Sequence, residues 1–490
     1  MNSSKLIAGK PSTYYLPESD PGPFGVGAGK PTYTTDQAGK HITRDNMRFQ
    51  DRNGDNKVDL SYTVDSSFTP QQKQRVREAV QSWQDVANIN FREQAGGTEG
   101  TVNIRNNPRG DRGVATFPRG TTTTTATIGT RGTNSAPALG SHFSVTTVHE
   151  IGHAIGLQHP GNYNGGGSSY NSGAVYTGDT KARSVMSYWS EKNQPGHDFK
   201  SLSPSAPMMD DIAAAQRLYG ANHQTRNTDT TYGFNSNTER EAMTLKSATD
   251  KPIFCVWDGG GDDTLDFSGF SQDQKINLNA ESFSDVGGLK GNVSIAKGCT
   301  VENATGGAGR DTLIGNEAGN RLKGGAGADT LRGGGGADIF IYDKASDSTP
   351  QHPDLIEDFT SGTDKIDVSG ALKEAGVSGL VFTDRFSGQA GEAVLKHDAT
   401  TGRASLEIDL AGKGTADLRV TSKGEIKPGD VHWAGHKPDV QPVPSVLPAP
   451  TPTPTPPVDP KTDTLTQLNK MVAKMLAVLM QLFQRLAKPS

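Results

Sequence analysis

The spacing of apolar residues predicts three helices in the first half of the chain. Residues 68–94, FTPQQKQRVREAVQSWQDVANINFREQ, start near a Thr-Pro pair and carry an apolar stripe at helical spacing, so we expect an amphipathic helix there. The stripe consists of Val76, Val80, Trp83 and Val86. A second helix is expected from Ser144, which would be its N-cap, to about Gly156. Residues 208–220, MMDDIAAAQRLYG, predict a third helix that ends at its final glycine.

β-Structure is predicted in two places. Residues 121–130, TTTTTATIGT, are mostly β-branched and predict a strand. From about 236 to 436 the pattern changes to short strands separated by glycine turns. Within this region, residues 306–341 divide into four units of nine: GGAGRDTLI, GNEAGNRLK, GGAGADTLR and GGGGADIFI. An earlier unit, DGGGDDTLD, stands at 258–266.

The nine-residue repeat is typical of a parallel β-roll that binds calcium. The eighth position of the contiguous units is always apolar, so we expect these side chains to point inward and build a core. They are Leu313, Leu322, Leu331 and Phe340. A glycine-rich linker would not keep these residues in phase.

Calcium is the expected ligand because the turns offer only oxygen atoms, from backbone carbonyls and from the aspartate at the sixth position. The predicted calcium-binding residues are Gly259, Gly261, Asp263, Gly306, Gly307, Gly309, Asp311, Gly324, Gly325, Gly327, Asp329, Gly333, Gly334, Gly336 and Asp338. In the second unit Asn320 replaces the aspartate and Ala318 replaces a glycine, so we expect that turn to bind weakly or not at all. Residues 51–59, DRNGDNKVD, resemble part of an EF-hand but are interpreted as a polar turn.

The composition narrows the class of protein. A chain of 490 residues allows two or three domains, and a net charge of -5 without a basic block argues against nucleic acid as a partner. The two cysteines, Cys255 and Cys299, are expected to be buried thiols rather than a disulfide. No apolar run reaches about eighteen residues, so we expect no transmembrane segment. The N-terminus lacks the apolar core of a signal peptide.

The stretch HEIGHAIGLQHP, which begins at His149, carries the chemistry. His149 and His153 are four residues apart, so both imidazoles lie on one face of a helix. Glu150 is rotated by about 100° and falls beside the metal as a base rather than a ligand. Gly156 can adopt the positive φ that ends the helix, and the turn returns His159 as a third ligand. Three neutral histidines with one open position are typical of catalytic zinc.

A methionine turn, SVMSYW, follows 25 residues after the third histidine. Together with HPGNYN and DIAAAQRLYG, it makes residues 35–436 resemble the serralysin family of bacterial secreted zinc metalloproteases, which are metzincins with a C-terminal calcium-binding repeat (RTX) β-roll. The resemblance implies that Met186 forms an apolar floor beneath the zinc ligands. It also implies that Tyr188 is an additional zinc ligand that swings aside and stabilises the oxyanion.

The implied function is a zinc-dependent endopeptidase that hydrolyses peptide bonds in proteins. Glu150 would act as general base on the zinc-activated water and then pass the proton to the leaving amine. We place the strand at 121–130 at the cleft edge, where it would pair with an extended substrate. The alternative is a calcium-dependent surface or adhesive protein whose protease site is vestigial. The cleavage specificity stays open.

The predicted architecture is an α+β metzincin-type protease domain over 36–235, followed by an all-β parallel β-roll/β-sandwich domain over 236–436. Residues 1–35 resemble a serralysin propeptide, which would make the chain a zymogen. Residues 437–461 read as a Pro/Thr linker. Residues 462–490 read as an amphipathic helix with a heptad seam. A displaced secretion signal, an oligomerisation helix and a membrane-surface helix remain open for this tail, in that order.

The calcium repeats also predict where the protein works. Extracellular modules bind calcium at about 0.1 to 1 mM, far above cytosolic levels, so we expect secretion. In the family, a type I secretion apparatus reads a C-terminal signal, and a proteinaceous inhibitor is a further implied partner. We therefore expect an extracellular protein with one catalytic zinc ion and several structural calcium ions.

Overall fold

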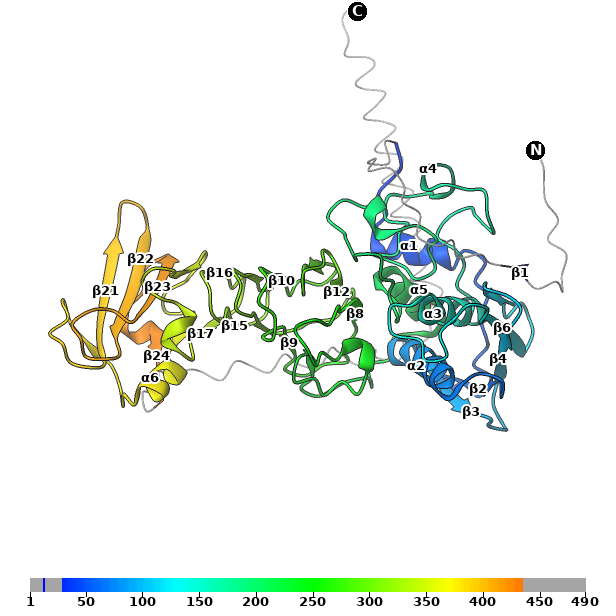
Figure 1. Ribbon diagram of the computed structural model, residues 1–490, viewed down its shortest axis with the longest axis horizontal. Coiled ribbons are helices and arrows are strands. Elements are labelled where there is room, and N and C mark those ends of the chain that lie inside the picture. Colours follow the sequence, from blue (N-terminus) through cyan, green and yellow to red (C-terminus); the bar gives the residue numbers. More distant parts are fainter. Residues whose placement is uncertain (1–11, 14–28, 435–490) are drawn as a thin grey trace, which may run out of the picture. The chain divides into compact units, whose positions relative to one another are not determined.

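The computed structural model describes residues 12–13 and 29–434 (Figure 1). The expected Pro/Thr linker, the expected tail helix and most of the expected leader lie outside the described residues. The elements of the first half are β1 (Ser12–Thr13), α1 (Thr35–Ile42), β2 (Val58–Val64), α2 (Pro70–Val86), β3 (Ile89–Glu93), β4 (Gly100–Asn107), β5 (Val114–Ala115), β6 (Thr123–Gly129), α3 (His142–Ala154), α4 (Tyr170–Gly173), η1 (Glu191–Asn193) and α5 (Met209–Tyr219).

The first half is a six-stranded sheet packed against helices, with strand order β1-β5-β6-β4-β2-β3. The four strands β6, β4, β2 and β3 are mutually parallel. The prediction of one helix over 68–94 was wrong at its C-terminal end, because α2 stops at Val86 and residues 89–93 form β3. Ile89 and Phe91 are buried alternately, which is the period of a strand rather than a helix.

The strand predicted over 121–130 exists as β6, but its predicted place at the cleft edge was wrong. β6 lies between β4 on one side and β5, which pairs with Ala126 and Thr127, on the other, so it is not the edge strand of the sheet. The antiparallel strand β5 is the outer one of this pair. The two leader residues Ser12 and Thr13 pair with it, antiparallel, opposite Ala115 and Val114. An extended segment can therefore add to the sheet at β5.

Helix α3 lies across the sheet, and nearly all of it is buried. Its N-cap is Ser141, whose hydroxyl accepts the N–H of Ser144, so the prediction of Ser144 as the cap was wrong by three residues. The indole N–H of Trp83 on α2 donates to the carbonyl of Val148 at 3.0 Å and fixes the two helices together. The third predicted helix is α5, which ends at Gly220 with φ +82°.

The second half is built almost entirely of short strands. These elements are β7 (Thr231–Gly233), η2 (Glu241–Met243), β8 (Phe254–Val256), β9 (Thr264–Asp266), β10 (Lys275–Asn277), β11 (Phe283–Ser284), β12 (Val293–Ile295), β13 (Asn303–Thr305), β14 (Thr312–Ile314), β15 (Arg321–Lys323), β16 (Thr330–Arg332), β17 (Ile339–Ile341), η3 (Ala345–Asp347), β18 (Asp354–Ile356), β19 (Lys365–Asp367), α6 (Ser369–Ala375), β20 (Val381–Phe382), β21 (Glu392–Asp398), β22 (Arg403–Asp409), β23 (Leu418–Lys423), η4 (Pro428–Asp430) and β24 (Val431–His432).

Successive repeat units alternate between two parallel sheets, and Figure 1 shows β10 and β16 along one side of the roll and β9, β15 and β17 along the other. One sheet has the strand order β10-β14-β16-β18-β23-β22-β21-β20, in which β23, β22 and β21 are antiparallel to their neighbours in that group. The other sheet has the order β24-β19-β17-β15-β13-β9-β7. The central residue of each three-residue strand points between the sheets. The predicted inward residues Leu313, Leu322, Leu331 and Phe340 are all fully buried, which confirms the nine-residue phase.

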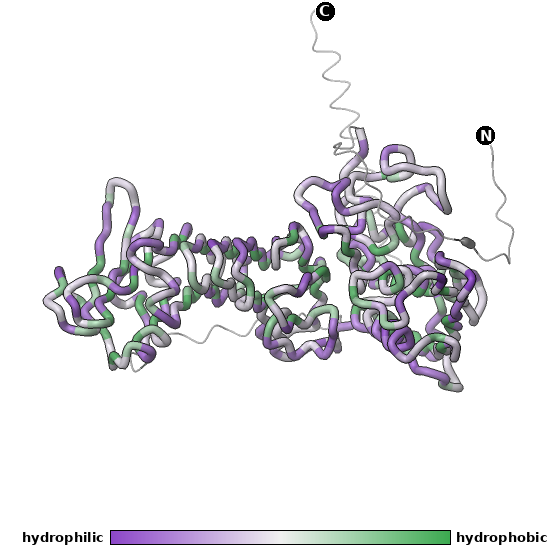
Figure 2. The backbone as a smooth tube through the Cα atoms, in the orientation of Figure 1, coloured by the Kyte–Doolittle hydropathy of each residue, from purple (hydrophilic) through white to green (hydrophobic). Residues whose placement is uncertain are grey.

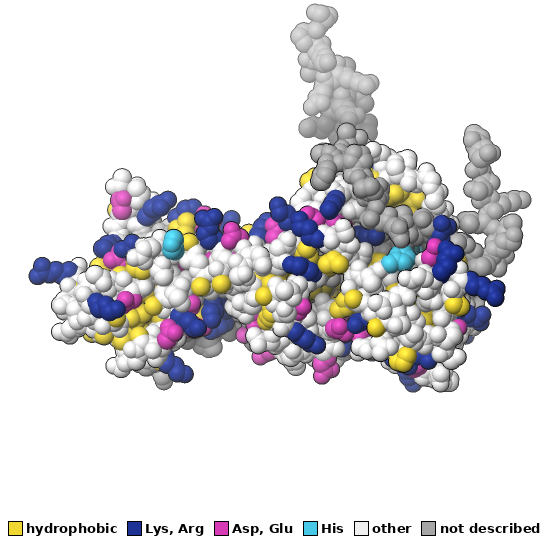
Figure 3. Space-filling view, viewed as in Figure 1, with side chains coloured by type: hydrophobic (Ala, Val, Ile, Leu, Met, Phe, Trp, Pro, Cys, Tyr) yellow, Lys and Arg dark blue, Asp and Glu magenta, His cyan; other side chains and the backbone are white. Residues whose placement is uncertain are grey.

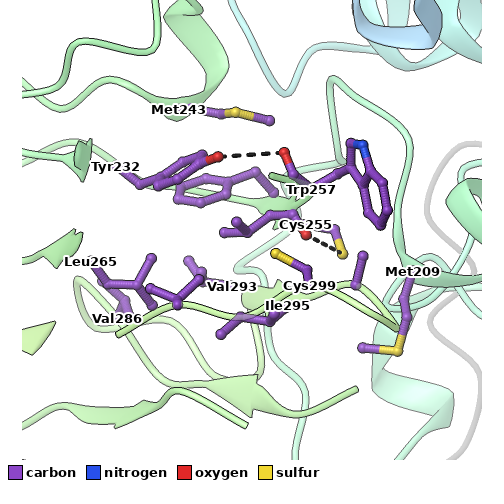
Figure 4. Packing of buried hydrophobic residues seen from close by; sticks show 14 of the residues in the cluster. Met209, Tyr232, Met243, Cys255, Trp257, Leu265, Val286, Val293, Ile295 and Cys299 are labelled. Carbon is purple, nitrogen blue, oxygen red and sulfur yellow. Dashed lines mark hydrogen bonds between the residues drawn. The ribbon is translucent and has the colours of Figure 1, made fainter. Parts of the chain in front are cut away.

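The core between the sheets continues toward the first half of the chain. Tyr232, Trp257 and the two cysteines meet in it (Figure 4), and Cys255 and Cys299 are buried free thiols, as expected from the sequence. A buried ion pair connects α2 with the segment after α5, where Asp85 binds the guanidinium of Arg226. Along the tube in Figure 2, hydrophobic (green) and hydrophilic (purple) residues alternate at short intervals.

The surface carries charges of both signs. On the face shown in Figure 3, acidic and basic side chains are interspersed rather than gathered on one element. Among the described residues, no helix has the length and apolar character needed to cross a bilayer.

Candidate metal centre

Three histidine side chains meet in the interior beside α3. His149 and His153 come from α3, and His159 follows the turn at Gly156, where φ is +113°. The Nε2 atom of His159 lies 3.2 Å from that of His149 and 3.1 Å from that of His153. Nitrogen atoms held about 2.0–2.1 Å from a tetrahedral zinc ion lie about 3.3 Å apart, so this donor set fits zinc.

Each Nδ1 atom of the triad lies within hydrogen-bond distance of a backbone carbonyl oxygen. The pairs are His149 with Val185 at 2.8 Å, His153 with Leu157 at 2.7 Å and His159 with Tyr163 at 2.9 Å. A carbonyl oxygen only accepts, so Nδ1 carries the proton and Nε2 directs a lone pair to the centre. Burial lowers the pKa of all three rings, that of His149 to about 4, so the rings are neutral at pH 7. Three converging lone pairs are suited to hold a cation between them.

Glu150 lies next to His149 on α3 and is fully buried. Neither of its carboxylate oxygens has a hydrogen-bond partner among the described residues. Burial raises the pKa of this carboxyl well above its ordinary value. The backbone at Gly113 packs so closely on the carboxylate that a β-carbon there would overlap it. A carboxylate in this position can accept a proton from a water molecule at the centre, which is the task of a general base.

Tyr188 and Met186 flank the triad. The ring of Tyr188 is buried, with its centroid 4.5 Å from that of His159 and 6.0 Å from that of His149. Met186 is fully buried, and a β-carbon at Gly152 would lie 2.6 Å from its sulfur atom. The methionine therefore packs directly against the helix that carries the first two histidines.

Sequence reasoning missed the residues that hold these groups. Asp211 on α5 accepts the backbone N–H of Val185 at 2.7 Å and so anchors the methionine turn from a helix more than twenty residues away. The ring of Tyr163 stacks on that of His159, with centroids 5.2 Å apart. Both residues lie in stretches that carry the family resemblance, HPGNYN and DIAAAQRLYG, but the sequence alone does not reveal these contacts.

Comparison with known proteins gives two family matches. The family described as "Peptidase M10 serralysin C terminal" matches residues 221–431, and the family described as "Metallo-peptidase family M12B Reprolysin-like" matches residues 55–227. Metallopeptidase AprA of Pseudomonas marginalis is 48% identical over 440 residues, which cover 82% of this chain and 92% of that protein. The chain belongs to the serralysin family of metallopeptidases.

Other serralysins are similar to nearly the same extent. Serralysin of Photorhabdus luminescens is 48% identical over 372 residues, 72% of this chain and 76% of that protein. Serralysin C of Dickeya chrysanthemi is 44% identical over 432 residues, 81% of this chain and 90% of that protein. This chain is therefore a zinc metallopeptidase, and its histidine triad is consistent with a catalytic zinc ion.

In this serralysin, the residues predicted to bind calcium lie in the turns between the short strands. Adjacent turns stack so closely that a β-carbon at Gly325 would overlap the carbonyl oxygen of Gly307. The aspartates hydrogen-bond from turn to turn: Asp329 accepts the N–H of Asp311 at 2.7 Å. In the unit that lacks an aspartate, Asn320 accepts the N–H of Asn316 at 2.7 Å and keeps the same turn without a charge.

Two carboxylates in these stacks were missed by the repeat pattern. Asp354 accepts the N–H of Asp329 at 2.8 Å, and Asp364 accepts that of Asp338 at 3.1 Å, so each continues one column of aspartates. Burial, and next the carboxylate of Asp329, raise the pKa of Asp354 to about 9. Burial likewise raises the pKa of Asp338 to about 7. The columns therefore concentrate buried acids that a cation would neutralise.

Proposed function

We propose that this chain is a secreted endopeptidase that cleaves peptide bonds in proteins, with zinc held by His149, His153 and His159 and with Glu150 as the general base. The convergence of the three Nε2 atoms carries this proposal, because each ring is fixed by a carbonyl at Nδ1 and the free carboxylate is adjacent. When bound, zinc supplies a Lewis acid that activates water and polarises the scissile carbonyl.

Glu150 carries both proton transfers, and Tyr188 stabilises the charge that develops. A carboxylate oxygen of Glu150 takes the proton of the attacking water, and the same oxygen then donates it to the nitrogen of the leaving amine. The hydroxyl of Tyr188 donates a hydrogen bond to the oxyanion as it forms. The buried setting strengthens both interactions because bulk water does not screen them.

We propose that the substrate backbone docks on β5 rather than on the threonine-rich strand β6. The antiparallel pairing of Ser12 and Thr13 with β5 supports this, since it shows that the edge accepts an extended segment. Such pairing holds the main chain and leaves sequence selectivity to side-chain pockets. The same pairing supports the proposal that residues 1–35 are a propeptide and that the chain is made as a zymogen.

We propose that the turns of the second half bind several structural calcium ions through the glycines and aspartates predicted from the repeats. The match of residues 221–431 to the serralysin C-terminal family supports this at the level of the family. Asp354 and Asp364 would join these ligands, because they extend the same two columns. Calcium would bind the ionised carboxylates and so remove the repulsion between them.

Serralysin-family proteins are typically secreted bacterial proteases. We propose export through a type I secretion apparatus, with the signal in residues 462–490, and inhibition outside the cell by a proteinaceous inhibitor. A chain truncated after residue 437 should then stay in the cell lysate, whereas the full chain reaches the culture supernatant. Normal export of the truncated chain would place the signal upstream, near residues 412–433.

Casein hydrolysis by the purified full chain tests the proposed activity. We expect cleavage that a chelator blocks and that added zinc restores, with calcium kept saturating throughout. Saturating calcium matters because loss of the β-roll would otherwise mimic loss of zinc. A folded, zinc-loaded protein that cleaves no protein substrate would contradict the proposal and favour a calcium-dependent surface protein.

A further inference from the structure

Asp179 is a buried acid behind the metal centre that the catalytic scheme does not use. Its side chain is fully buried, and one oxygen, Oδ1, accepts two hydroxyl groups. The hydroxyl of Tyr163 donates at 2.8 Å and that of Ser187 donates at 2.7 Å. When the carboxyl is ionised both hydrogen bonds are charge-assisted, and such bonds are about twice as strong as neutral ones.

The first of these hydrogen bonds leads to the third histidine. The backbone carbonyl of Tyr163 accepts the Nδ1–H of His159 at 2.9 Å, and the Tyr163 ring stacks on the imidazole at an angle of 25°. The far end of the tyrosine is the hydroxyl that Asp179 holds. Asp179 therefore fixes the residue that sets both the tautomer and the plane of His159.

The second hydrogen bond leads to Tyr188. Ser187 immediately precedes Tyr188, and its hydroxyl also accepts the backbone N–H of Trp189 at 3.2 Å. The backbone on both sides of Tyr188 is thus tied to the same carboxylate. The ring of Tyr188 packs on that of Tyr163, with centroids 4.7 Å apart.

Fold stability alone does not explain why an acid is buried at position 179. Its second oxygen, Oδ2, has no hydrogen-bond partner among the described residues. A β-carbon at Gly161 would lie 2.7 Å from that oxygen, so the space beside it is closed by the turn after the third histidine. A buried carboxylate with an unsatisfied oxygen costs free energy that an apolar side chain would not.

We propose that Asp179 is a positioning residue that couples the third histidine to Tyr188, so that metal binding and the placement of the tyrosine hydroxyl depend on one carboxylate. This inference rests on the proposed roles of His159 and Tyr188. Residues that orient metal ligands from outside typically contribute about 10- to 100-fold in metal affinity or activity. We expect an effect of that size here, divided between the hydrogen bond from Tyr163 and the hydrogen bond from Ser187.

Copper(II) substitution of the full chain gives a readout that a merely structural residue would not move. A coordinated phenolate gives copper(II) a visible charge-transfer band, so the band reports on Tyr188. In Asp179→Asn we expect the band to shift or weaken, zinc to dissociate about tenfold faster into a chelator, and kcat to fall about tenfold with little change in KM. The matched control is Asp409→Asn in β22, another fully buried aspartate that accepts two hydrogen bonds. It should leave all three readouts unchanged.

Two variants that each remove one hydroxyl group test the two hydrogen bonds to Asp179 separately, even if Asp179→Asn does not fold. Tyr163→Phe should chiefly speed zinc loss, and Ser187→Ala should chiefly change the copper band. Wild-type zinc kinetics, band and kcat in Asp179→Asn, or in both single variants, would overturn the inference. Tyr188→Phe tests whether Tyr188 is a metal ligand at all, apart from its positioning by Asp179. A copper band that survives Tyr188→Phe would show instead that the proposed tyrosine ligand is wrong.

Discussion

Replacing Asp329 with asparagine should stabilise the calcium-free protein and destabilise the calcium-loaded one. Burial, and next the carboxylate of Asp311, raise the pKa of Asp329 from 3.8 to about 7. Its Oδ1 accepts the N–H of Asp311, and its Oδ2 is buried without a partner among the described residues. Asparagine keeps an accepting oxygen and removes the charge; Asn320 in the preceding unit likewise accepts a backbone N–H without a charge, from Asn316 within its own turn.

The sign follows from the raised pKa. Between pH 3.8 and about 7 the folded calcium-free chain holds a proton on Asp329 that the unfolded chain has released, so stability falls as the pH rises through this window. A shift of this size corresponds to about 4 kcal/mol at pH 8, and relaxation and water penetration around the ionised group reduce it to about 2 kcal/mol. Removing the carboxylate should raise the free energy of unfolding by that amount, which corresponds to an increase of about 4–8 °C in Tm for a domain of about 200 residues.

If Asp329 binds calcium as proposed, calcium reverses the sign, because the ionised carboxylate is then a ligand. Loss of one site that is saturated at about 100 times its Kd lowers stability by about 2.7 kcal/mol. Calorimetry at pH 8, with and without calcium, should therefore show the Tm of Asp329→Asn above wild type in chelator and below wild type in calcium. Asp384→Asn, at an exposed position, should show neither shift. A lower Tm than wild type in both conditions would refute the reasoning.

Three further substitutions test other parts of the structure. Gly156→Ala should destabilise the fold by more than about 1 kcal/mol and weaken zinc binding, because φ is +113° and a β-carbon would overlap the Met47 carbonyl; a Tm equal to wild type would contradict this. Tyr188→Phe should lower kcat about 10²-fold and leave zinc bound, as measured on a peptide substrate with metal analysis. Asp85→Asn should lower stability by about 3–5 kcal/mol, since Arg226 would lose its buried partner, and denaturant unfolding measures the loss.

The parts of the site that the sequence predicts are those that local geometry dictates. A four-residue spacing on a helix places two imidazoles on one face, and only a residue that tolerates positive φ can turn the chain at Gly156. The nine-residue phase predicts Leu322 and its equivalents as core because a strand of three residues has one inward position. In both cases neighbouring residues alone define the outcome.

The parts that the sequence does not predict depend on contacts between distant segments. Asp179 meets the histidine triad only after folding, and nothing in its local pattern marks it. Tyr163 lies in the HPGNYN stretch, but the sequence does not show that its ring stacks on His159. The repeat pattern does not predict Asp354, because residues 342–353 interrupt the nine-residue phase before the column of aspartates continues. The sequence pattern predicts helix at 89–93 because the short apolar run continues directly from α2, and only pairing with β2 decides its structure.

The most direct test of the account measures turnover and zinc content together in Glu150→Gln. The variant keeps all three histidine ligands, so we predict about one zinc ion per chain. It loses the base, so we predict a kcat lower by about 10²- to 10⁴-fold on the same peptide substrate. Glu407→Gln, which changes a buried glutamate on β22, serves as the control and should retain both zinc and turnover. Near wild-type turnover in zinc-loaded Glu150→Gln would contradict the central claim.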